Sequence, residues 1–316
     1  MADTLRIGTR GSSLALAQAR LVAGELRRLL PDLDTSLVEI RTSGDQLATA
    51  SLAQVGGKGL FIRELEAALK NGEIDLAVHS LKDLPAQLSD EFRLAAVPRR
   101  EDTRDVLVTR DGSTLTALPA GARVGTSSLR RRFEAARANA QISIVPMRGN
   151  VDTRLRKVAD HEVDAIIVAL AGLKRLGRAA TVKLQVLDQR DFIPAGGQGA
   201  LAIEALRDGP RVRARDLETA LEALNDPESR YETAAERAFL ASIGASCATP
   251  VGVRASVADA IFSVRALLFS PDGSRVLADA VEMPVEFKLR SEMAAACGEK
   301  LARQMLAHGA AELIGG

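Results

Sequence analysis

Residues 79–85 combine the side chains of a catalytic turn. Ser80, Lys82 and Asp83 stand within four positions of one another, directly after the apolar run Leu76–Val78. In open α/β sheets, catalytic groups gather where buried strands end. A neighbouring ammonium group favours the ionised carboxylate, which can then stabilise a cation or accept a proton. The competing interpretation is a turn whose charges only pair with each other.

Two serine-rich segments precede predicted helices. Gly11–Ser13 stands before a helix that we expect to run to about Leu30, and Thr126–Ser128 stands before one that ends near Asn139. The N–H groups and the dipole at a helix start attract anions. Each serine also suits a plain N-cap. Because a serine-rich segment precedes a predicted helix twice, we favour anion binding. Neither segment has the spacing of a phosphate loop.

Arginines are concentrated on the same elements. Arg130, Arg131 and Arg132 are consecutive in the first turn of a predicted helix, where cations oppose the helix dipole. Bound carboxylates would relieve that conflict, because guanidinium forks match carboxylates bidentately. The alternative is a solvated face in an arginine-rich protein. Further basic residues at comparable positions are Arg10, Arg148, Arg154, Lys174 and Arg175.

The two cysteines differ in their surroundings. Cys247 lies in the small-residue loop Gly244–Pro250, whereas Cys297 follows a run of alanines. A loop thiol could serve as a nucleophile or as an attachment point, and a structural role is an equal alternative. No histidine lies near it in the sequence, so a Cys–His pair is unsupported. The polar, glycine-bearing segment 42–59, which contains Lys58, could form a lid.

Composition limits the classes of protein that remain. The 316 residues suggest two or three domains, and the hydrophobic (47%) and charged (26%) shares are those of a soluble protein. A net charge of +1 gives no field for nucleic acid or a membrane surface. Two Cys and three His argue against a disulfide framework and a metal site. No secretory signal or spanning apolar run is evident, so we expect a cytoplasmic chain.

Short strands alternate with helices along most of the chain, which predicts parallel sheets of the βαβ kind. The expected strands are 5–9, 37–41, 76–78, 143–147, 165–169 and 201–204. The expected helices are 12–30, 60–70, 128–139, 151–159, 216–243 and 287–310. Between residues 251 and 284 we expect short strands around a turn at 271–273.

The two halves of the α/β region contain similar sequence segments. Gly8–Leu14 is similar to Gly125–Leu129, and Glu73–Val78 is similar to Glu162–Val168. Two similar α/β lobes, with a cleft where strand ends and helix starts converge, are the economical prediction. The remainder of the chain predicts a third, smaller α+β domain.

Taken together, these segments resemble the porphobilinogen deaminases, also called hydroxymethylbilane synthases. The resemblance runs in order along essentially the whole chain, with Cys247 in its expected place. It departs at Thr103, where Pro is frequent, and in the residues just before Cys247. The matching stretches are 6–10, 55–61, 77–85, 100–102, 124–131, 148–155 and 171–177.

The resemblance implies a fold class and a reaction. The fold would be α/β, with two lobes like those of type II periplasmic binding proteins and a smaller α+β C-terminal domain. Domain 1 would comprise 1–99 and 195–222, domain 2 would be 100–194, and domain 3 would be 223–316. Four porphobilinogen molecules would be condensed head to tail, with loss of ammonia, on a dipyrromethane cofactor joined to Cys247, and hydroxymethylbilane would then be released by hydrolysis.

The resemblance also implies roles for individual residues. Asp83 and Lys82 would be catalytic, with Asp83 stabilising the cation left when ammonia departs. Besides Cys247, the cofactor would be held by Asp83, Ser80, Lys82, Thr126, Ser127, Ser128, Arg130, Arg131, Arg148 and Gly149. Substrate acids would be bound by Arg10, Gln18, Lys58, Arg148, Arg154 and Arg175. No metal is implied, and the family favours a monomer.

Two other functions share parts of this pattern. A two-lobed solute- or effector-binding protein would have the same architecture without catalysis. It explains neither Cys247 nor the pair Lys82 and Asp83 at a strand end. A phosphate-transfer enzyme fails on motif spacing and on the lack of a metal-binding carboxylate cluster.

Overall fold

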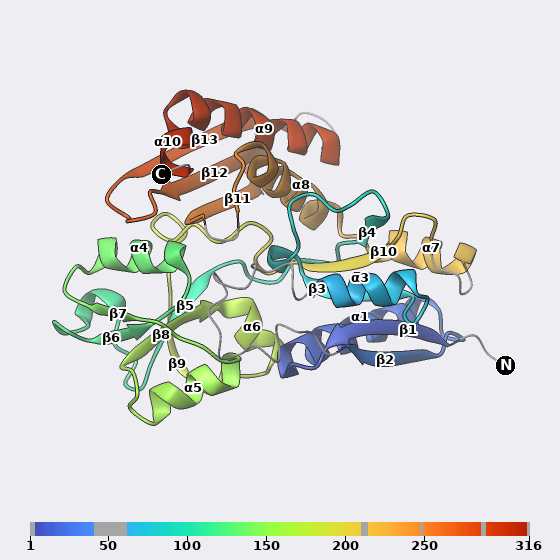
Figure 1. Cartoon of the computed structure of the whole chain (residues 1–316), viewed down its shortest axis with the longest axis horizontal. Helices are drawn as coiled ribbons and strands as arrows, with labels where there is room; N and C mark the ends of the chain where they lie inside the picture. The colour runs from blue at the N-terminus through green and yellow to red at the C-terminus, as the bar shows by residue number, and fades with distance from the viewer. Residues whose placement is uncertain (1–3, 41–61, 210–213, 247–248, 286–288, 315–316) are drawn as a thin grey trace. The chain divides into compact units, whose positions relative to one another are not determined.

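The computed structural model describes residues 4–40, 62–209, 214–246, 249–285 and 289–314 (Figure 1). By internal contacts the chain divides into two compact units, each made of two segments. Unit 1 comprises Met1–Glu101 and Ala200–Arg230, and unit 2 comprises Asp102–Gly199 and Tyr231–Gly316. The prediction of three domains with the boundaries given above stays a prediction.

A five-stranded sheet with the order β2-β1-β3-β10-β4 forms the centre of unit 1. The first three strands of the chain pair in parallel, and β10 runs antiparallel to both of its neighbours. The strands are β1 (Leu5–Arg10), β2 (Thr35–Ile40), β3 (Leu76–Ser80), β4 (Phe92–Ala96) and β10 (Leu201–Leu206).

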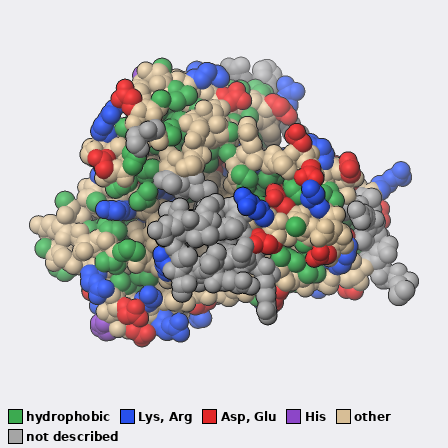
Figure 2. Space-filling model, in the orientation of Figure 1, with side chains coloured by type: hydrophobic (Ala, Val, Ile, Leu, Met, Phe, Trp, Pro, Cys, Tyr) green, Lys and Arg blue, Asp and Glu red, His purple; other side chains and the backbone are tan. Residues whose placement is uncertain are grey.

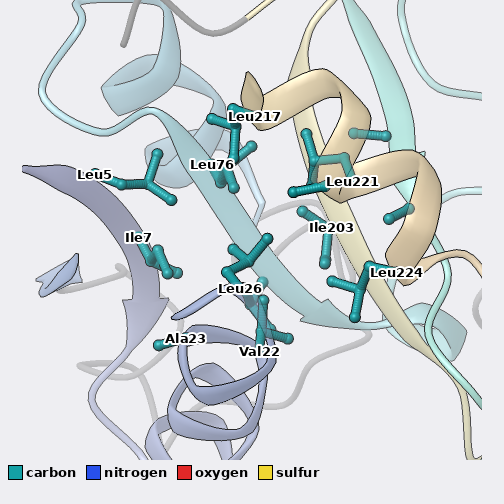
Figure 3. Packing of buried hydrophobic residues seen from close by; sticks show 14 of the residues in the cluster. Leu5, Ile7, Val22, Ala23, Leu26, Leu76, Ile203, Leu217, Leu221 and Leu224 are labelled. Atoms are coloured by element: carbon teal, nitrogen blue, oxygen red, sulfur yellow. The ribbon is translucent and has the colours of Figure 1, made fainter. Parts of the chain in front are cut away.

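Helices α1 (Ser13–Leu29), α3 (Arg63–Lys70) and α7 (Ala214–Leu224) pack on this sheet. Ser12 is the N-cap of α1, and its hydroxyl accepts the N–H of Ala15 at 3.3 Å. Figure 3 shows apolar side chains from α1 and α7 meeting those of the strands. The labelled residues are Leu5, Ile7, Val22, Ala23, Leu26, Leu76, Ile203, Leu217, Leu221 and Leu224.

Unit 2 contains a second five-stranded sheet, in the order β7-β6-β8-β5-β9. Its strands are β5 (Asp105–Thr109), β6 (Arg123–Gly125), β7 (Ser143–Val145), β8 (Ala165–Ala169) and β9 (Lys183–Val186). Its helices are α4 (Leu129–Ala138), α5 (Val151–Ala159) and α6 (Leu170–Arg175).

The two sheets repeat one design. In each, three strands pair in parallel and the fourth position holds an antiparallel strand from a distant part of the chain. Asp75 accepts the backbone N–H of Arg6 at 2.8 Å, and Asp164 accepts that of Arg123 at 2.7 Å. The echo seen in the sequence is therefore a structural repeat, and the predicted fold class with two α/β lobes is confirmed.

A three-stranded antiparallel sheet completes unit 2, as the predicted smaller α+β part. It consists of β11 (Val251–Ala258), β12 (Ile261–Phe269) and β13 (Val276–Pro284). Helices α8 (Pro227–Ser242), α9 (Ser291–Ala307) and α10 (Ala310–Ile314) pack with this sheet around one apolar core. Figure 1 shows α9 lying across β12 and β13.

Three expectations about these elements are wrong. The sheets are mixed rather than parallel, because β10 and β5 enter them antiparallel. The stretch 216–243 is two helices, since Pro227 begins α8 and the Asp226 carboxylate accepts the Ser229 N–H at 2.8 Å, a capping contact. The strands between 251 and 284 have eight or nine residues and are not short, although the turn at 271–273 joins β12 and β13 as expected.

The loop that follows β9 is fixed by the C-terminal part of unit 2. Val253 donates its N–H to the carbonyl of Pro194 at 2.9 Å, and Gly197 donates to the Glu236 carboxylate at 2.7 Å. Phe133 of α4 packs against Phe269 of β12 with ring centroids 5.4 Å apart. These contacts hold residues 194–197 against β11 and α8, and α4 against β12.

The face of the molecule seen in Figure 2 carries charges of both signs. In Figure 2, Lys and Arg side chains on the visible face are interspersed with Asp and Glu. Among the described residues, no helix combines the length and the apolar character needed to cross a membrane.

Two helical glycines predict opposite responses to the same substitution. A Cβ at Gly298 of α9 would overlap the carbonyl oxygen of Ala235 in α8, whereas one at Gly24 of α1 meets no atom within 4 Å. We expect Gly298→Ala to lower the free energy of unfolding by ~1–3 kcal/mol, because helix backbones cannot move apart without loss. Gly24→Ala should raise it by about 0.5–1 kcal/mol through helix propensity. Thermal melts of both variants check the signs; equal shifts would contradict the close approach of α8 and α9.

Candidate active site

The strand-end turn of unit 1 is built by the central strand of its sheet. β3 ends at Ser80, and a single 3-10 turn, η2 (Leu81–Asp83), follows. Leu81 is buried and donates its N–H to the carbonyl of Ala200 at 3.0 Å, which anchors the turn to the start of β10. Lys82 and Asp83 are half-buried. The carboxylate and the ammonium group therefore stand at the carboxyl end of a buried strand, as the sequence predicts.

Gln18 and Arg10 lie on the elements next to this turn. The Gln18 side chain is buried in α1, and its amide is 2.9 Å from the Ser80 hydroxyl. Arg10 ends β1, which pairs in parallel with β3, so both strands end at the same edge of the sheet. The structure thus brings Gln18 and Ser80 into contact and sets Arg10 on the neighbouring strand.

His79 has a structural environment. Its Nε2 atom is 3.0 Å from the Glu204 carboxylate, across the β3–β10 pair, and both side chains are almost fully buried. This pair joins β3, the strand that carries Ser80, to its neighbour β10.

The serine-rich turn of unit 2 uses its hydroxyls within the protein. Ser128 is the N-cap of α4, and its hydroxyl accepts the Arg131 N–H at 3.4 Å. Ser127 donates to the carbonyl of Met147 at 2.7 Å and accepts that residue's N–H at 3.0 Å. Thr126 is buried and accepts the N–H of Ser128 at 3.2 Å. Capping and loop closure therefore account for all three side chains, and their predicted contacts with a cofactor stay a prediction.

The arginine triplet divides into a buried pair and an exposed residue. Arg130 and Arg131 are 4% and 7% exposed, whereas Arg132 is exposed and lies 5.6 Å from the Phe133 ring centroid. The solvated-face interpretation thus holds for Arg132 alone.

The buried pair shares one carboxylate, which the sequence reasoning did not identify. Asp105 has no exposed surface and accepts from Arg130 Nη2 at 2.8 Å and from Arg131 Nη2 at 2.7 Å. Burial acts to raise the pKa of Asp105, but the charges of Arg130 and Arg131 hold it well below its usual range. A charged residue opening the apolar strand Val106–Val108 was the available signal.

Glu134 is the second acid of this cluster. Its Oε2 atom accepts from Arg130 Nη1 at 2.6 Å, and its Oε1 atom is buried without a partner among the described residues. Burial raises the pKa of Glu134 to about 8, against the attraction of Arg130 and with the help of the Asp105 charge. Arg130 thus donates hydrogen bonds to two acids. Asp105 keeps its charge, whereas burial favours the protonated form of Glu134.

The remaining candidate arginines of unit 2, Arg148, Arg154 and Arg175, follow β7 and β8. Arg154 donates from Nε to the carbonyl of Gly149 at 2.9 Å, and Gly149 has a φ of 100°, which suits glycine. Burial, and then the charge of Arg131, lowers the pKa of Arg154. Arg148 is exposed, and Arg175 donates to the carbonyl of Gly199 at 2.6 Å.

Lys58 and Cys247 lie outside the described residues, so their predicted roles stay predictions. Next to Cys247, the Ser246 N–H donates to the Thr249 hydroxyl at 2.9 Å, and the Thr249 N–H donates to the carbonyl of Ser246 at 3.1 Å. In the part of the chain that the structure describes, no group of three His, Cys, Asp or Glu side chains could hold a metal ion.

The fold and these residues define an α/β protein with two similar sheets and basic side chains at strand ends. Comparison with protein families identifies two matches. Residues 5–214 match the family model "Porphobilinogen deaminase, dipyromethane cofactor binding domain", and residues 231–307 match "Porphobilinogen deaminase, C-terminal domain". The chain belongs to the porphobilinogen deaminase family, as its motifs predict.

Curated relatives agree along the whole length. A porphobilinogen deaminase of Chromobacterium violaceum is 45% identical over 312 residues, covering 99% of this chain and 97% of the relative. One of Sorangium cellulosum is 49% identical over 276 residues, covering 87% of this chain and 90% of the relative.

Among solved structures, a probable amino-acid ABC transporter extracellular-binding protein of Bacillus subtilis is similar, with a TM-score of 0.42 and 13% identity. The match covers 71% of this chain and 92% of that protein. An ancestral arginine-binding protein matches with a TM-score of 0.36 and 16% identity, covering 70% and 91% of the two chains.

The buried Glu134 predicts a pH dependence of stability. Its pKa is about 8 in the folded chain and near 4.5 when unfolded, so the folded state keeps a proton that the unfolded state releases between these values. Stability contributed by that proton is present below pH 4.5 and is lost as the pH rises toward 8, by at most ~1.4 kcal/mol per pH unit.

We therefore expect the melting temperature to fall more steeply from about pH 5 to about pH 8 in the parent chain than in Glu134→Gln, which has no proton to lose. Melts at several pH values measure the two slopes. A parent slope equal to that of the variant would show that Glu134 is ionised throughout the range.

Proposed function

We propose that this chain is a hydroxymethylbilane synthase. It condenses four porphobilinogen molecules head to tail with loss of ammonia, and it then releases the linear tetrapyrrole by hydrolysis. Membership of the porphobilinogen deaminase family over nearly the full length supports this function and not the alternative of a non-catalytic binding protein.

The residues of unit 2 fit an acidic cofactor. The positive charge of Arg131 acts on Arg154 and lowers its pKa. Arg154 donates to a backbone carbonyl and makes no ion pair with any described residue. Two cations near each other favour a bound anion between them or beside them. Each pyrrole of dipyrromethane carries an acetate and a propionate, which supply such anions. The contacts of this unit with a ligand are a proposal based on that electrostatic match.

Dipyrromethane, bound through a thioether to Cys247, would supply the pyrrole carbon onto which the substrate is joined. The chain's own residues would then orient the acids and move protons. Arg131, Arg148 and Arg154 would bind carboxylates of the cofactor and of the growing chain. Gly149 and the residues Thr126, Ser127 and Ser128 would form the backbone surface around them.

Asp83 is proposed as the principal catalytic group. Its place after β3 sets a carboxylate at the strand end where substrates of open α/β sheets bind. As the amine of porphobilinogen leaves as ammonia, a positive charge develops on the substrate, and a fixed carboxylate stabilises it. Lys82, Ser80 and Arg10 would hold the substrate acids, with Gln18 positioning Ser80 through their hydrogen bond.

Three finer points belong to the same proposal. The chain would act in the cytoplasm, as a monomer, and without nucleic acid or a membrane; the interspersed surface charges and the net charge of +1 support this. The division into three domains at about residues 99, 194 and 222 would place the cofactor cysteine in the last domain. Lys58 would contact the growing chain.

The covalent cofactor predicts a mass difference. Purified chain should be heavier than its sequence by two pyrrole units, because a thioether survives denaturation. Cys247→Ser should lose this excess, whereas Cys297→Ser, at the buried cysteine of α9, should keep it. Intact mass spectrometry measures all three. Active parent chain with the mass of its sequence would exclude a covalent cofactor.

The proposed role of Asp83 predicts a loss of turnover without a loss of structure. Asp83→Asn should keep its fold and its cofactor, while kcat falls by about 10²–10⁴-fold, since one electrostatic and proton-transfer group is removed. Asp90→Asn, at an exposed position of the same unit, is the matched control and should retain activity. Near-normal turnover in Asp83→Asn would assign the chemistry to another carboxylate.

A further inference from the structure

The first turn of α4 depends on a residue from a different strand. Asp105 opens β5 and pairs with Ala169, the last residue of β8. Its Oδ2 atom accepts from Arg130, and its Oδ1 atom accepts from Arg131 Nη2 at 2.7 Å and Nε at 3.1 Å. One carboxylate therefore fixes two guanidinium groups.

This arrangement is unusual for neighbouring residues of a helix. Side chains at i and i+1 point in different directions and do not face each other. Arg130 and Arg131 nevertheless converge, because Asp105 lies beneath the first turn and offers one oxygen to each. Its negative charge also reduces the repulsion between them.

Gln198 completes the contact from a second direction. Its side chain is fully buried; Nε2 donates to Asp105 at 2.9 Å and to the carbonyl of Thr103 at 2.7 Å. Its Oε1 atom accepts from Arg131 Nη2 at 3.2 Å. The amide orientation is thus determined by partners on both sides, and Arg131 is held by two side chains.

The contacts of the Arg131 guanidinium group determine which of its N–H donors can bind a ligand. Nε and both N–H groups of Nη2 are used by Asp105 and Gln198, and Nη1 donates to the carbonyl of Ile167 at 3.3 Å. Of the five N–H donors of a guanidinium group, one on Nη1 has no partner among the residues that the structure describes. The Nε–Nη2 edge is therefore occupied within the protein.

We propose that Asp105 and Gln198 are positioning residues for Arg131 in the condensation reaction. They hold its guanidinium group so that it meets a ligand carboxylate through one Nη1 N–H and its charge, not through a bidentate fork. This inference rests on the proposed function, since it assigns Arg131 to a carboxylate of the cofactor or the growing chain. It predicts that a lysine at position 131, which has no Nε–Nη2 edge to anchor, would not replace Arg131.

The test uses kinetics and intact mass on the complete chain. We expect Gln198→Met, which keeps length and neutrality but removes the polar contacts with Asp105, Thr103 and Arg131, to raise KM for porphobilinogen about five- to tenfold with little change in kcat. Asp105→Asn should lower cofactor loading or kcat/KM about ten- to a hundredfold, because both arginines lose a charged hydrogen bond. Asp111→Asn, at an exposed aspartate after the other end of β5, is the matched control.

A double variant separates positioning from general stability. If Gln198 acts through Arg131, then Gln198→Met should change KM less than twofold in an Arg131→Lys background, because the group it positions is already lost. The inference would be overturned if the effects of the two substitutions on KM multiplied in the double variant. An unchanged KM in Gln198→Met alone would also overturn it. If Asp105→Asn fails to fold, the comparison of Gln198→Met in the parent and Arg131→Lys backgrounds still tests the inference. A parent chain with neither cofactor mass nor turnover would instead refute the proposed function.

Discussion

Arginine side chains buried next to one another, such as Arg130 and Arg131, repel each other, so nearby acids must hold them together. Unit 2 does so with two buried acids, of which Asp105 carries the charge. Asp105 bridges Arg130 and Arg131, while Glu134 binds the far side of Arg130. A buried pair of this kind contributes little net stability but is costly to break, because the remaining charge is left without a partner. The first turn of α4, the strand β5 and the loop carrying Gln198 therefore depend on the same cluster.

The repeated sheets give this cluster its counterpart in unit 1. In both sheets three parallel strands end at one edge, and candidate site residues follow those ends. Unit 1 carries the compact turn with Lys82 and Asp83, and unit 2 carries most of the candidate arginines. One sheet design thus carries a carboxylate at a strand end in unit 1 and arginines in unit 2, and the proposed function assigns both to the same ligand.

Local signals in the sequence predicted the parts of this arrangement that depend on neighbouring residues. The helix starts near Ser12 and Ser128, a buried strand just before Ser80 and the repeat of two lobes were all predicted from local patterns. Contacts between distant residues were not. Asp105 and Gln198 are separated from Arg131 by 26 and 67 positions, and no periodic pattern connects them. The antiparallel strands β5 and β10 were missed as such for the same reason: the direction of a strand depends on where the chain returns.

The central claim is that substrate units are added to a chain covalently held by this protein, among arginines fixed by buried acids. Mass spectra of the parent chain, taken during reaction with limiting porphobilinogen, test it most directly. We predict a ladder of protein masses above the cofactor-carrying form, spaced by one pyrrole unit and ending at the fourth addition. Product accumulating in solution while the protein mass stays constant at every time would contradict the account.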